Sequence, residues 1–206
     1  ALPIYLPLIT VYPGDIPKIV DSVECILADT NKFYVRGGAV VSLHRDKNTS
    51  DLEVRIATRS SLVRTVSLLS TWEKKAFDTY IVCDPPNKYM DLLLDGQDFS
   101  RIRHLKSIAR QPFFRPSGGL VIEPGYDVES GVYCDFVKSS YKFDLNPQKV
   151  DALKAVNDLK KLLSEFSFAE EVDLITAIAA IITGVVRQSL RSAPLFHIKA
   201  PQIASG

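Results

Sequence analysis

The stretch FYVRGGAVVSLH, residues 33–44, decides the expected fold of this chain. Two runs of strand-forming residues, Phe33 to Arg36 and Ala39 to His44, flank the pair Gly37-Gly38. Two glycines are typical of the two-residue turn of a β-hairpin, because both turn positions need φ > 0 and glycine has no Cβ to oppose it. The stretch therefore predicts an antiparallel hairpin in the first quarter of the chain.

Strands and helices are expected on both sides of this hairpin. Upstream, Leu6 to Tyr12 predicts a strand, and Pro13-Gly14 predicts a turn. A helix should follow, because apolar residues then recur at helical spacing: Ile16, Ile19, Val20, Val23 and Leu27. Downstream, Glu53 to Thr58 predicts another strand. The next helix has one apolar face and either Ser60 or Ser61 as its cap.

The middle of the chain continues this alternation of strands and helices. Tyr80 to Cys83 predicts a strand, and Pro85-Pro86 predicts the start of a helix that stops near Gly96. Turn residues rich in Pro and Gly then separate two short β-prone runs, Leu120 to Ile122 and Val132 to Phe136. These runs predict a compact hairpin or meander.

Helices dominate after Phe136. Asn146-Pro147 should start one helix, whose apolar face is Val150, Leu153, Val156, Leu159 and Leu162. Ser167 to Glu170 has a capping-box pattern for a second helix, which is apolar nearly all round from Leu174 to Val186 and is expected to be buried. We therefore expect an α+β fold: a mixed domain over residues 1–140, a helical segment over 141–192, and the first strand of a further domain within 193–206.

Bulk composition fits an ordinary globular protein. The 206 residues carry a formal net charge of +1, so there is no overall attraction to nucleic acid, membranes or acidic ligands. Cys25, Cys83 and Cys134 are odd in number and far apart, which argues against a disulfide framework or a zinc site. The longest apolar stretch is shorter than the roughly 20 residues that span a bilayer, and the start lacks the pattern of a secretion signal. We expect a cytoplasmic protein without a membrane partner.

Positive charge is concentrated in two places. No acidic residue occurs between Asp98 and Glu123, where aromatic residues alternate with cations. The candidate DNA-binding residues are Arg101, Arg103, Lys106, Arg110 and Arg115, together with Lys74 and Lys75 beside Trp72. Such a pattern suits single-stranded nucleic acid, because phosphates need positive charge and unstacked bases need π-faces. The alternative is a solvated face whose phenylalanines belong to the core.

Other chemically interesting residues have structural interpretations. Gly118, Gly119 and Gly125 suit tight β-turns better than a phosphate loop, since no helix start follows them. Asp127 and Glu129 suit turn chemistry better than a metal site or an acid-base pair. His197, on the expected last strand, is more typical of a core histidine than of a ligand. The sequence therefore predicts no catalytic residues and no metal ligands in this chain.

The end of the chain matches the part of a P-loop that precedes its lysine. In a P-loop, a buried strand leads into a small-residue loop whose amides bind phosphate, and Lys-Ser or Lys-Thr opens the next helix. Leu195 to Ile198 would be the strand, and the loop positions are Pro201, Gln202, Ile203, Ala204, Ser205 and Gly206. On spacing alone, a frayed terminal tail explains this stretch about as well.

Several short motifs follow one another along the chain: IPKIVD (16–21), YVRGG (34–38), CDPP (83–86), RPSGG (115–119), PGYD (124–127), SGVY (130–133), FSF (166–168), APLF (193–196) and AP (200–201). Their order resembles the segment upstream of the helicase ATPase in phage-, plasmid- and prophage-type primase-helicases. In that family four residues separate the last Ala-Pro from Gly-Lys-Ser or Gly-Lys-Thr, which gives Gly206 the place of the second P-loop glycine. Ala204 departs from the glycine common in that loop.

The resemblance implies a function for the chain and for its parent. The chain would be a non-catalytic part of a mobile-element DNA replication protein and would position or bind single-stranded or forked DNA. The parent would be an ATP-dependent DNA helicase that self-associates through its ATPase domain, with ATP and Mg²⁺ as cofactors that this chain alone does not hold. A protein-interaction or oligomerisation module is the alternative, with the helix from Ala169 to Ser189 packed against a neighbouring subunit. A catalytic primase would need a cluster of acidic metal ligands, which the sequence does not show.

Overall fold

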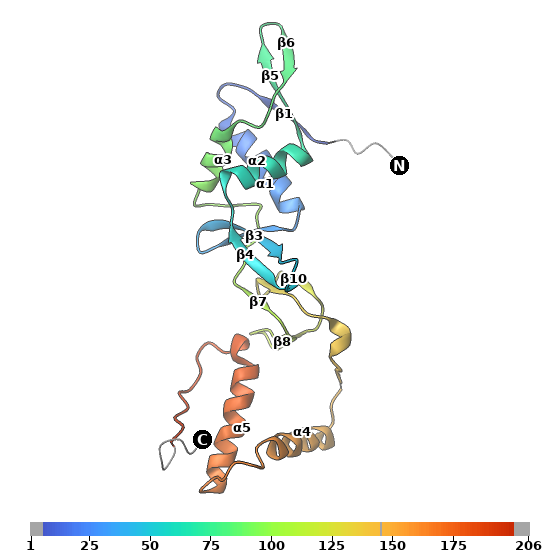
Figure 1. Cartoon of the computed structure of the whole chain (residues 1–206), viewed down its shortest axis with the longest axis vertical. Helices are drawn as coiled ribbons and strands as arrows, with labels where there is room; N and C mark the ends of the chain where they lie inside the picture. The colour runs from blue at the N-terminus through green and yellow to red at the C-terminus, as the bar shows by residue number, and fades with distance from the viewer. Residues whose placement is uncertain (1–5, 145, 200–206) are drawn as a thin grey trace. The chain divides into compact units, whose positions relative to one another are not determined.

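The computed structural model describes residues 6–144 and 146–199, and it has the mixed α+β architecture that the sequence predicts. The chain forms two compact units, residues 1–107 and residues 108–206 (Figure 1). The predicted change from strands to helices near residue 140 lies within the second unit, after the short 3₁₀ turn η1 (Lys138–Ser140).

The first unit is built from helices packed on small sheets. Its elements, in chain order, are β1 (Leu8–Val11), α1 (Ile16–Asp29), β2 (Phe33–Arg36), β3 (Ala39–Arg45), β4 (Leu52–Ile56), α2 (Arg59–Leu69), β5 (Thr71–Ala76), β6 (Thr79–Val82) and α3 (Asn87–Leu94). β1 pairs in parallel with β5, which pairs antiparallel with β6. β2, β3 and β4 form an antiparallel meander.

The hairpin at Gly37-Gly38 confirms the prediction from the opening stretch. Arg36 pairs with Ala39 and Val35 with Val40, so the two glycines alone form the turn. Their φ angles are +59° and +80°, the left-handed values that a turn of this length requires. Tyr34, Val35, Val40 and Val41 are buried, which anchors the hairpin to the core.

Helix α1 confirms its predicted apolar face except at its first residue, Ile16, which is 42% exposed. Ile19, Val23, Ile26 and Leu27 are buried in the core cluster of the first unit, beside Trp72 from β5. Full burial of an aliphatic side chain of this size contributes roughly 1.5–3 kcal/mol. This face therefore supplies much of the stability of the first unit.

The cap of α2 differs from the prediction of Ser60 or Ser61. Thr58 is the N-cap: its hydroxyl accepts the Ser61 backbone N–H at 3.2 Å, and the Ser61 hydroxyl accepts the Thr58 N–H at 2.9 Å. Thr58 has the extended backbone that an N-cap needs, whereas the helix has already begun at Arg59. The strand expected from Glu53 to Thr58 is observed as β4, Leu52–Ile56, and Thr58 caps the helix that follows.

The second unit combines short strands with two longer helices. Its elements are β7 (Ser107–Ala109), β8 (Phe113–Phe114), β9 (Leu120–Val121), β10 (Gly125–Asp127), β11 (Val132–Cys134), η1, α4 (Lys149–Leu162), α5 (Glu171–Val185) and η2 (Arg187–Ser189). β10, β11 and β7 form one sheet, and β8 pairs with β9. A small core of Ala109, Phe113, Val121, Val132 and Cys134 lies among these strands. The two predicted runs do not pair with each other: β9 pairs with β8, and β11 pairs with β10 and β7, so the region forms two small sheets in place of the single hairpin or meander expected.

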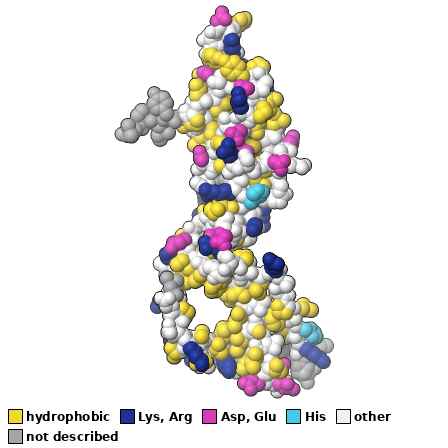
Figure 2. Space-filling model, turned by 180° about the vertical axis from the view of Figure 1, so that it is seen from behind, with side chains coloured by type: hydrophobic (Ala, Val, Ile, Leu, Met, Phe, Trp, Pro, Cys, Tyr) yellow, Lys and Arg dark blue, Asp and Glu magenta, His cyan; other side chains and the backbone are white. Residues whose placement is uncertain are grey.

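The prediction that α5 is a buried core helix is wrong. Ile178 is its one buried residue among those described, whereas Val172, Ile175 and Ile182 are 56%, 54% and 45% exposed. The predicted apolar face of α4 is also largely at the surface, and Figure 2 shows apolar side chains gathered over these helices. An apolar sequence indicates that a helix needs a cover, but it does not say which element supplies it.

The start of α5 is also different from the capping box expected at Ser167 to Glu170. The helix begins at Glu171, and the Asp173 carboxylate accepts the backbone N–H of Glu170, the N-cap residue, at 3.1 Å. The reciprocal pattern is therefore Glu170 with Asp173, three residues downstream of the predicted pair. Ser167 lies before the helix because Phe168 and Ala169 are not yet helical.

The predicted strand from Leu195 to Ile198 is wrong as well. Residues 192–199 form no strand, and Leu195 and Ile198 are 95% and 92% exposed. His197 is exposed rather than part of a core. A single strand is not stable without a neighbour to accept its backbone hydrogen bonds, and no described strand of this chain pairs with it. The predicted P-loop positions Pro201 to Gly206 lie outside the described residues.

Candidate nucleic-acid interface

The predicted basic segment 101–106 runs beside β2 in the first unit. Val35 donates its backbone N–H to the Arg103 carbonyl at 2.9 Å and accepts from the Leu105 N–H at 2.8 Å. Ile102 and Leu105 are buried, whereas Arg101, Arg103 and Lys106 are exposed. The cations therefore lie on a solvated face that buried apolar residues hold in place.

A buried carboxylate fixes the start of this segment. Glu24 of α1 is only 6% exposed, and its Oε1 accepts the backbone N–H groups of Arg101 at 2.6 Å and Ile102 at 3.1 Å. Two hydrogen bonds to one buried charge compensate its loss of hydration. The segment is consequently anchored to α1 at its backbone, independently of the side chains.

The exposed cations of this segment differ in their partners. Arg101 Nε donates to Asp21 Oδ1 at 3.2 Å, and this hydrogen bond raises the pKa of Arg101. Arg103 Nη1 donates to Asn31 Oδ1 at 3.1 Å. Lys106 has no ion pair with a residue that the structure describes. Among these three cations, Lys106 has the charge most accessible to a phosphate.

Arg115, in the second unit, holds a structural ion pair. Its Nη2 lies 2.5 Å from Asp127 Oδ1, and its Nε lies 3.4 Å from Glu129 Oε2. The Arg115 hydrogen bond lowers the pKa of Asp127 to about 2, and Ser130 donates its backbone N–H to the same carboxylate at 3.0 Å. The carboxylates of Asp127 and Glu129 thus have the turn role that the sequence predicts. Arg110 is exposed and lies on the loop after β7.

The aromatic residues near these cations are mostly structural. Phe99 packs against the core of the first unit, and Phe113 is buried in the core of the second. Phe114 is 41% exposed. The interleaved pattern of the sequence therefore arises largely from core residues that alternate with surface residues.

A different set of aromatic side chains lies on the sheet of β1, β5 and β6. Ile9 and Trp72 are neighbours on β1 and β5, and both face the helical core. Successive side chains of a strand point to opposite faces, so Thr10 and Glu73 belong to the outer face. The Thr10 hydroxyl indeed donates to Glu73 Oε1 at 2.7 Å. Residues that lie two positions before or after Thr10 or Glu73 along a strand therefore also belong to the outer face of the sheet.

Tyr12, Lys75 and Tyr80 form a cluster on this outer face, which we name the tyrosine platform. Lys75 pairs with Tyr80 across β5 and β6, and Tyr12 directly follows β1. The two tyrosine hydroxyls are in hydrogen-bond contact, and the rings are 6.1 Å apart at 66°. Because β1 and β6 flank β5, these side chains meet over the central strand that bears Lys75. The hydrogen bond with Tyr12 raises the pKa of Tyr80.

The platform presents aromatic surface to solvent. Tyr12 and Tyr80 are 38% and 43% exposed, and Lys75 is exposed without an ion pair to any described residue. The predicted pair Lys74-Lys75 is divided between the two faces of the sheet. Lys74 lines an open hollow of about 710 Å³ beside Ser67 and Asp84, on the side of α2 and α3.

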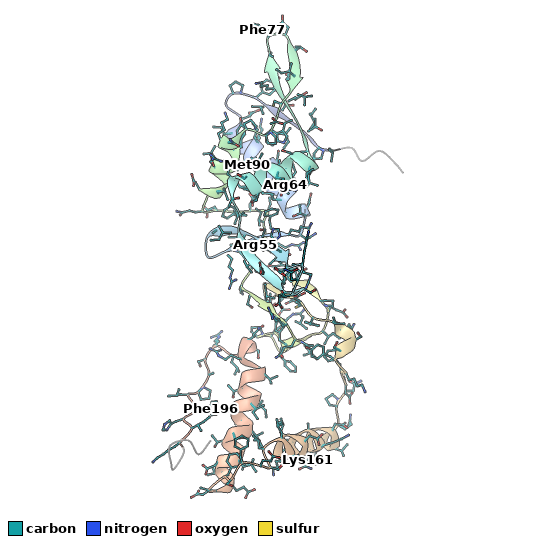
Figure 3. The ribbon with its side chains drawn as sticks, in the orientation of Figure 1. Arg55, Arg64, Phe77, Met90, Lys161 and Phe196 are labelled. Carbon is teal, nitrogen blue, oxygen red and sulfur yellow. The ribbon has the colours of Figure 1, made fainter. Side chains whose placement is uncertain are left out.

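The turn between β5 and β6 carries one more exposed aromatic residue. Phe77 occupies the first position of the two-residue turn, with a φ of +53° and 97% exposure. Figure 3 shows its side chain at the tip of the hairpin, beyond the helices of the first unit. A left-handed backbone costs an L-residue with a large side chain roughly 1–2 kcal/mol.

Sequence reasoning missed both the platform and this turn. TWEKKA and TYIV, residues 71–76 and 79–82, are two β-prone runs separated by two residues, which is the spacing of a hairpin. Phe77-Asp78 is not a typical turn pair, so the turn was not recognised. The alternation of residues about that turn was the signal available for placing Lys75 and Tyr80 on one face.

The remaining candidates are the turn glycines, the cysteines and possible metal ligands, and the structure gives none of them a functional site among the described residues. Gly118 has a φ angle of +96° in the predicted tight turn, where its N–H donates to the Arg115 carbonyl at 2.9 Å. Gly125 also has a positive φ, +111°, but it is the first residue of β10 and not part of a turn. Cys25, Cys83 and Cys134 are free, and burial raises the pKa of the Cys134 thiol to about 11. No group of three His, Cys, Asp or Glu side chains in the described ranges could hold a metal ion. Nor is any helix in the described part of the chain long and apolar enough to cross a membrane.

Comparison of the chain with protein-family models, with curated protein sequences and with solved structures finds no match.

Proposed function

We propose that this chain is a non-catalytic module of a mobile-element DNA replication protein, and that it binds single-stranded or forked DNA beside an ATP-driven helicase domain. The tyrosine platform is the observation that carries the DNA-binding part of the proposal. It offers two exposed aromatic rings and an unpaired lysine on one face of a sheet. The motif order of the sequence supports the replication context.

The chemistry of the platform suits unstacked bases. A base has a π-face whatever its sequence, and stacking on aromatic side chains contributes about 1–3 kcal/mol per base. Tyrosine rings on a sheet are held rigidly, so little conformational entropy is lost when a base stacks on them. Lys75 lies on the same face and can contact the phosphate of a nucleotide whose base stacks there. Base pairing hides these π-faces, so the platform favours single strands over duplex.

Charge plays the smaller part at this site. The hairpin from Thr71 to Val82 contains Lys74 and Lys75, which are balanced by Glu73 and Asp78. Binding through the platform should therefore release few counterions, and affinity should fall only weakly as salt rises. A shallow salt dependence distinguishes this site from binding through a basic patch.

Fluorescence anisotropy with a labelled single-stranded oligonucleotide tests the proposal on the whole chain. We expect Tyr12→Ala combined with Tyr80→Ala to weaken binding by about 5- to 150-fold, the cost of one lost stacking contact. The matched variant, Tyr12→Phe with Tyr80→Phe, removes the hydroxyl contact but keeps both rings, so it should retain most of the affinity. Equal loss in both variants would show that the hydroxyls, and not the π-faces, matter.

The cations predicted from the sequence are tested in the same assay. Reversal of charge at Arg101, Arg103 and Lys106 should weaken binding and flatten its dependence on salt, if the strand continues from the platform onto this segment. Lys106→Glu alone should weaken binding more than Arg101→Glu alone, because Asp21 already offsets the charge of Arg101. Unchanged affinity would remove these three residues from the DNA path.

The nucleotide-binding part of the proposal concerns Pro201 to Gly206. We propose that these residues begin a P-loop that a following Lys-Ser or Lys-Thr pair would complete, with ATP and Mg²⁺ bound by the longer protein. Reading the coding sequence downstream of Gly206 tests this directly. A Lys-Ser or Lys-Thr pair followed by a helix-forming run supports it, and a stop codon or unrelated residues contradict it.

A second function is favoured by a separate observation. α4 and α5 expose Val150, Leu153, Ile175 and Ile182, which are between 45% and 68% exposed. Contiguous apolar surface of this kind marks an interaction site. An oligomerisation module without DNA affinity would show a mass that rises with concentration in light scattering and no binding in the anisotropy assay.

A further inference from the structure

Phe77 is placed where folding alone gives no reason for a phenylalanine. The first position of this two-residue turn has a φ of +53°, which glycine or asparagine adopts more readily than an aromatic residue. The side chain is 97% exposed, so it gains no burial in return. A residue that is unfavourable for the backbone and useless for the core points to a role outside the fold.

The surroundings of Phe77 define what it could contact. The hairpin of β5 and β6 extends past the helices of the first unit, and Figure 1 shows its turn at the far end of that unit. Every residue from Thr79 to Val82 is exposed, so both faces of the hairpin near its tip are open. Lys74 and Lys75 lie on opposite faces, three and two residues before Phe77 respectively. An apolar ring thus projects between two cations that face opposite sides.

We propose that Phe77 is a wedge that inserts between neighbouring base pairs where a duplex opens into single strands. The inference rests on the proposed function, because it assigns the tip of the hairpin to the junction and the tyrosine platform to the separated strand. Apolar side chains inserted at base steps unstack them without reading sequence. The two lysines, on either side of the hairpin, would each face one of the two diverging strands.

The surroundings of Phe77 favour DNA over a membrane as its partner. The platform lies on the same hairpin, since Tyr80 is three residues after Phe77, so one strand can run from the wedge onto the stacking surface. A membrane-inserting tip would gain from additional apolar residues at the turn, but Phe77 is followed by Asp78 and Thr79. A charged carboxylate beside the ring opposes insertion into lipid.

The test uses a forked DNA with 2-aminopurine in the last base pair before the single strands. The fluorescence of this base rises when it is unstacked, so it reports the wedge itself. We expect the wild-type chain to raise the signal and to bind the fork at least about 5-fold more tightly than the single strand, the lower bound for one stacking contact. Phe77→Gly keeps a residue that accepts the turn and should abolish both effects, whereas Phe77→Trp should retain them.

Controls separate failure of this inference from failure of the proposed function. Phe166→Ala removes another exposed phenylalanine and should change neither signal. If Phe77→Gly retains the 2-aminopurine signal and the preference for forks while the platform variants lose single-strand binding, the wedge is wrong and the proposed function stands. If neither set of variants affects DNA binding, both are wrong. Loss of binding to phosphatidylserine vesicles in Phe77→Gly, with DNA binding unchanged, would overturn the wedge in favour of a membrane contact.

Discussion

Single residues decide how the candidate interface is held. Glu24 is the clearest case, because its buried carboxylate accepts two backbone amides of the basic segment. We predict that Glu24→Ala lowers the free energy of unfolding of the first unit by about 1.5–3 kcal/mol, the range for hydrogen bonds to a charged group. The fluorescence of Trp72 during urea unfolding measures this change, since it is the one tryptophan of the chain and is buried in that unit.

A matched exposed carboxylate is the control for this prediction. Glu53 binds Arg55 at the surface, with its side chain 44% exposed, so Glu53→Ala should change the same transition by less than about 1 kcal/mol. If the two variants unfold at the same urea concentration, the Glu24 hydrogen bonds do not stabilise the basic segment as we infer.

Asp127 is the residue that should make the second unit sensitive to acid. Its pKa in the fold is about 2, below its ordinary value of 3.8, because Arg115 donates to it. A lowered pKa stabilises the fold above the ordinary value, and this contribution disappears as the pH falls through the folded value. As the pH falls from about 4 to about 2, we therefore predict a falling protection factor, the ratio of the intrinsic hydrogen-exchange rate at each pH to the observed rate, for the peptide covering residues 115–134.

The variant Asp127→Asn isolates this effect. It removes the titrating group, so its protection factor should already be lower than that of the wild type at pH 7 and should change little between about pH 4 and pH 2. An acid response in Asp127→Asn as large as that of the wild type would show that other groups cause it.

At the scale of elements, the hairpin of β5 and β6 combines a strained turn with an exposed aromatic side chain, both at Phe77. We predict that Phe77→Gly leaves the free energy of unfolding unchanged or raises it by up to about 1 kcal/mol, because glycine relieves the left-handed strain but gains chain entropy when unfolded. Urea unfolding followed by Trp72, which lies on β5, measures the change. A fall of more than about 1 kcal/mol would mean that the ring stabilises the fold, and the argument for an external role would fail.

The helices α4 and α5 raise the question of what covers their apolar faces. If they form an interface between copies of the chain, Ile175→Lys combined with Ile182→Lys should lower the mass measured by light scattering. The Trp72 transition of the first unit should stay unchanged, because these residues belong to the second unit. A mass that is monomeric before substitution, or unaffected by it, argues against self-association through α5.

The elements that the sequence predicted correctly have strong local causes. Gly37-Gly38 determines its turn through backbone conformation, and α1 follows from the regular spacing of Ile19, Val23 and Leu27. The errors occurred where the environment decides. The burial of α5 and the strand at Leu195 to Ile198 both depend on partners that local sequence does not specify.

The candidate site was less predictable than the fold. The sequence located Lys75 but not Tyr12 and Tyr80, which lie 68 residues apart and meet only through the pairing of β1, β5 and β6. Long-range strand pairing of this kind leaves no local motif. The turn at Phe77-Asp78 is local, but its two residues do not favour the turn that they form, so the sequence did not predict it.

At the scale of the whole molecule, the two compact units have different expected functions. The first unit carries the tyrosine platform, the wedge and the anchored basic segment, and we assign DNA binding to it. The second unit carries the exposed apolar helices, and we assign contact with other protein to it. The whole chain would then connect DNA with the helicase domain that we propose to follow it.

Anisotropy of a labelled single-stranded oligonucleotide is the most direct test of this account, with the wild-type chain compared with Tyr12→Ala/Tyr80→Ala and Tyr12→Phe/Tyr80→Phe. We expect the wild type to bind, the alanine variant to lose about 5- to 150-fold in affinity, and the phenylalanine variant to keep near wild-type affinity. No binding by the wild type at low salt, or equal binding by the wild type and the alanine variant, would contradict it.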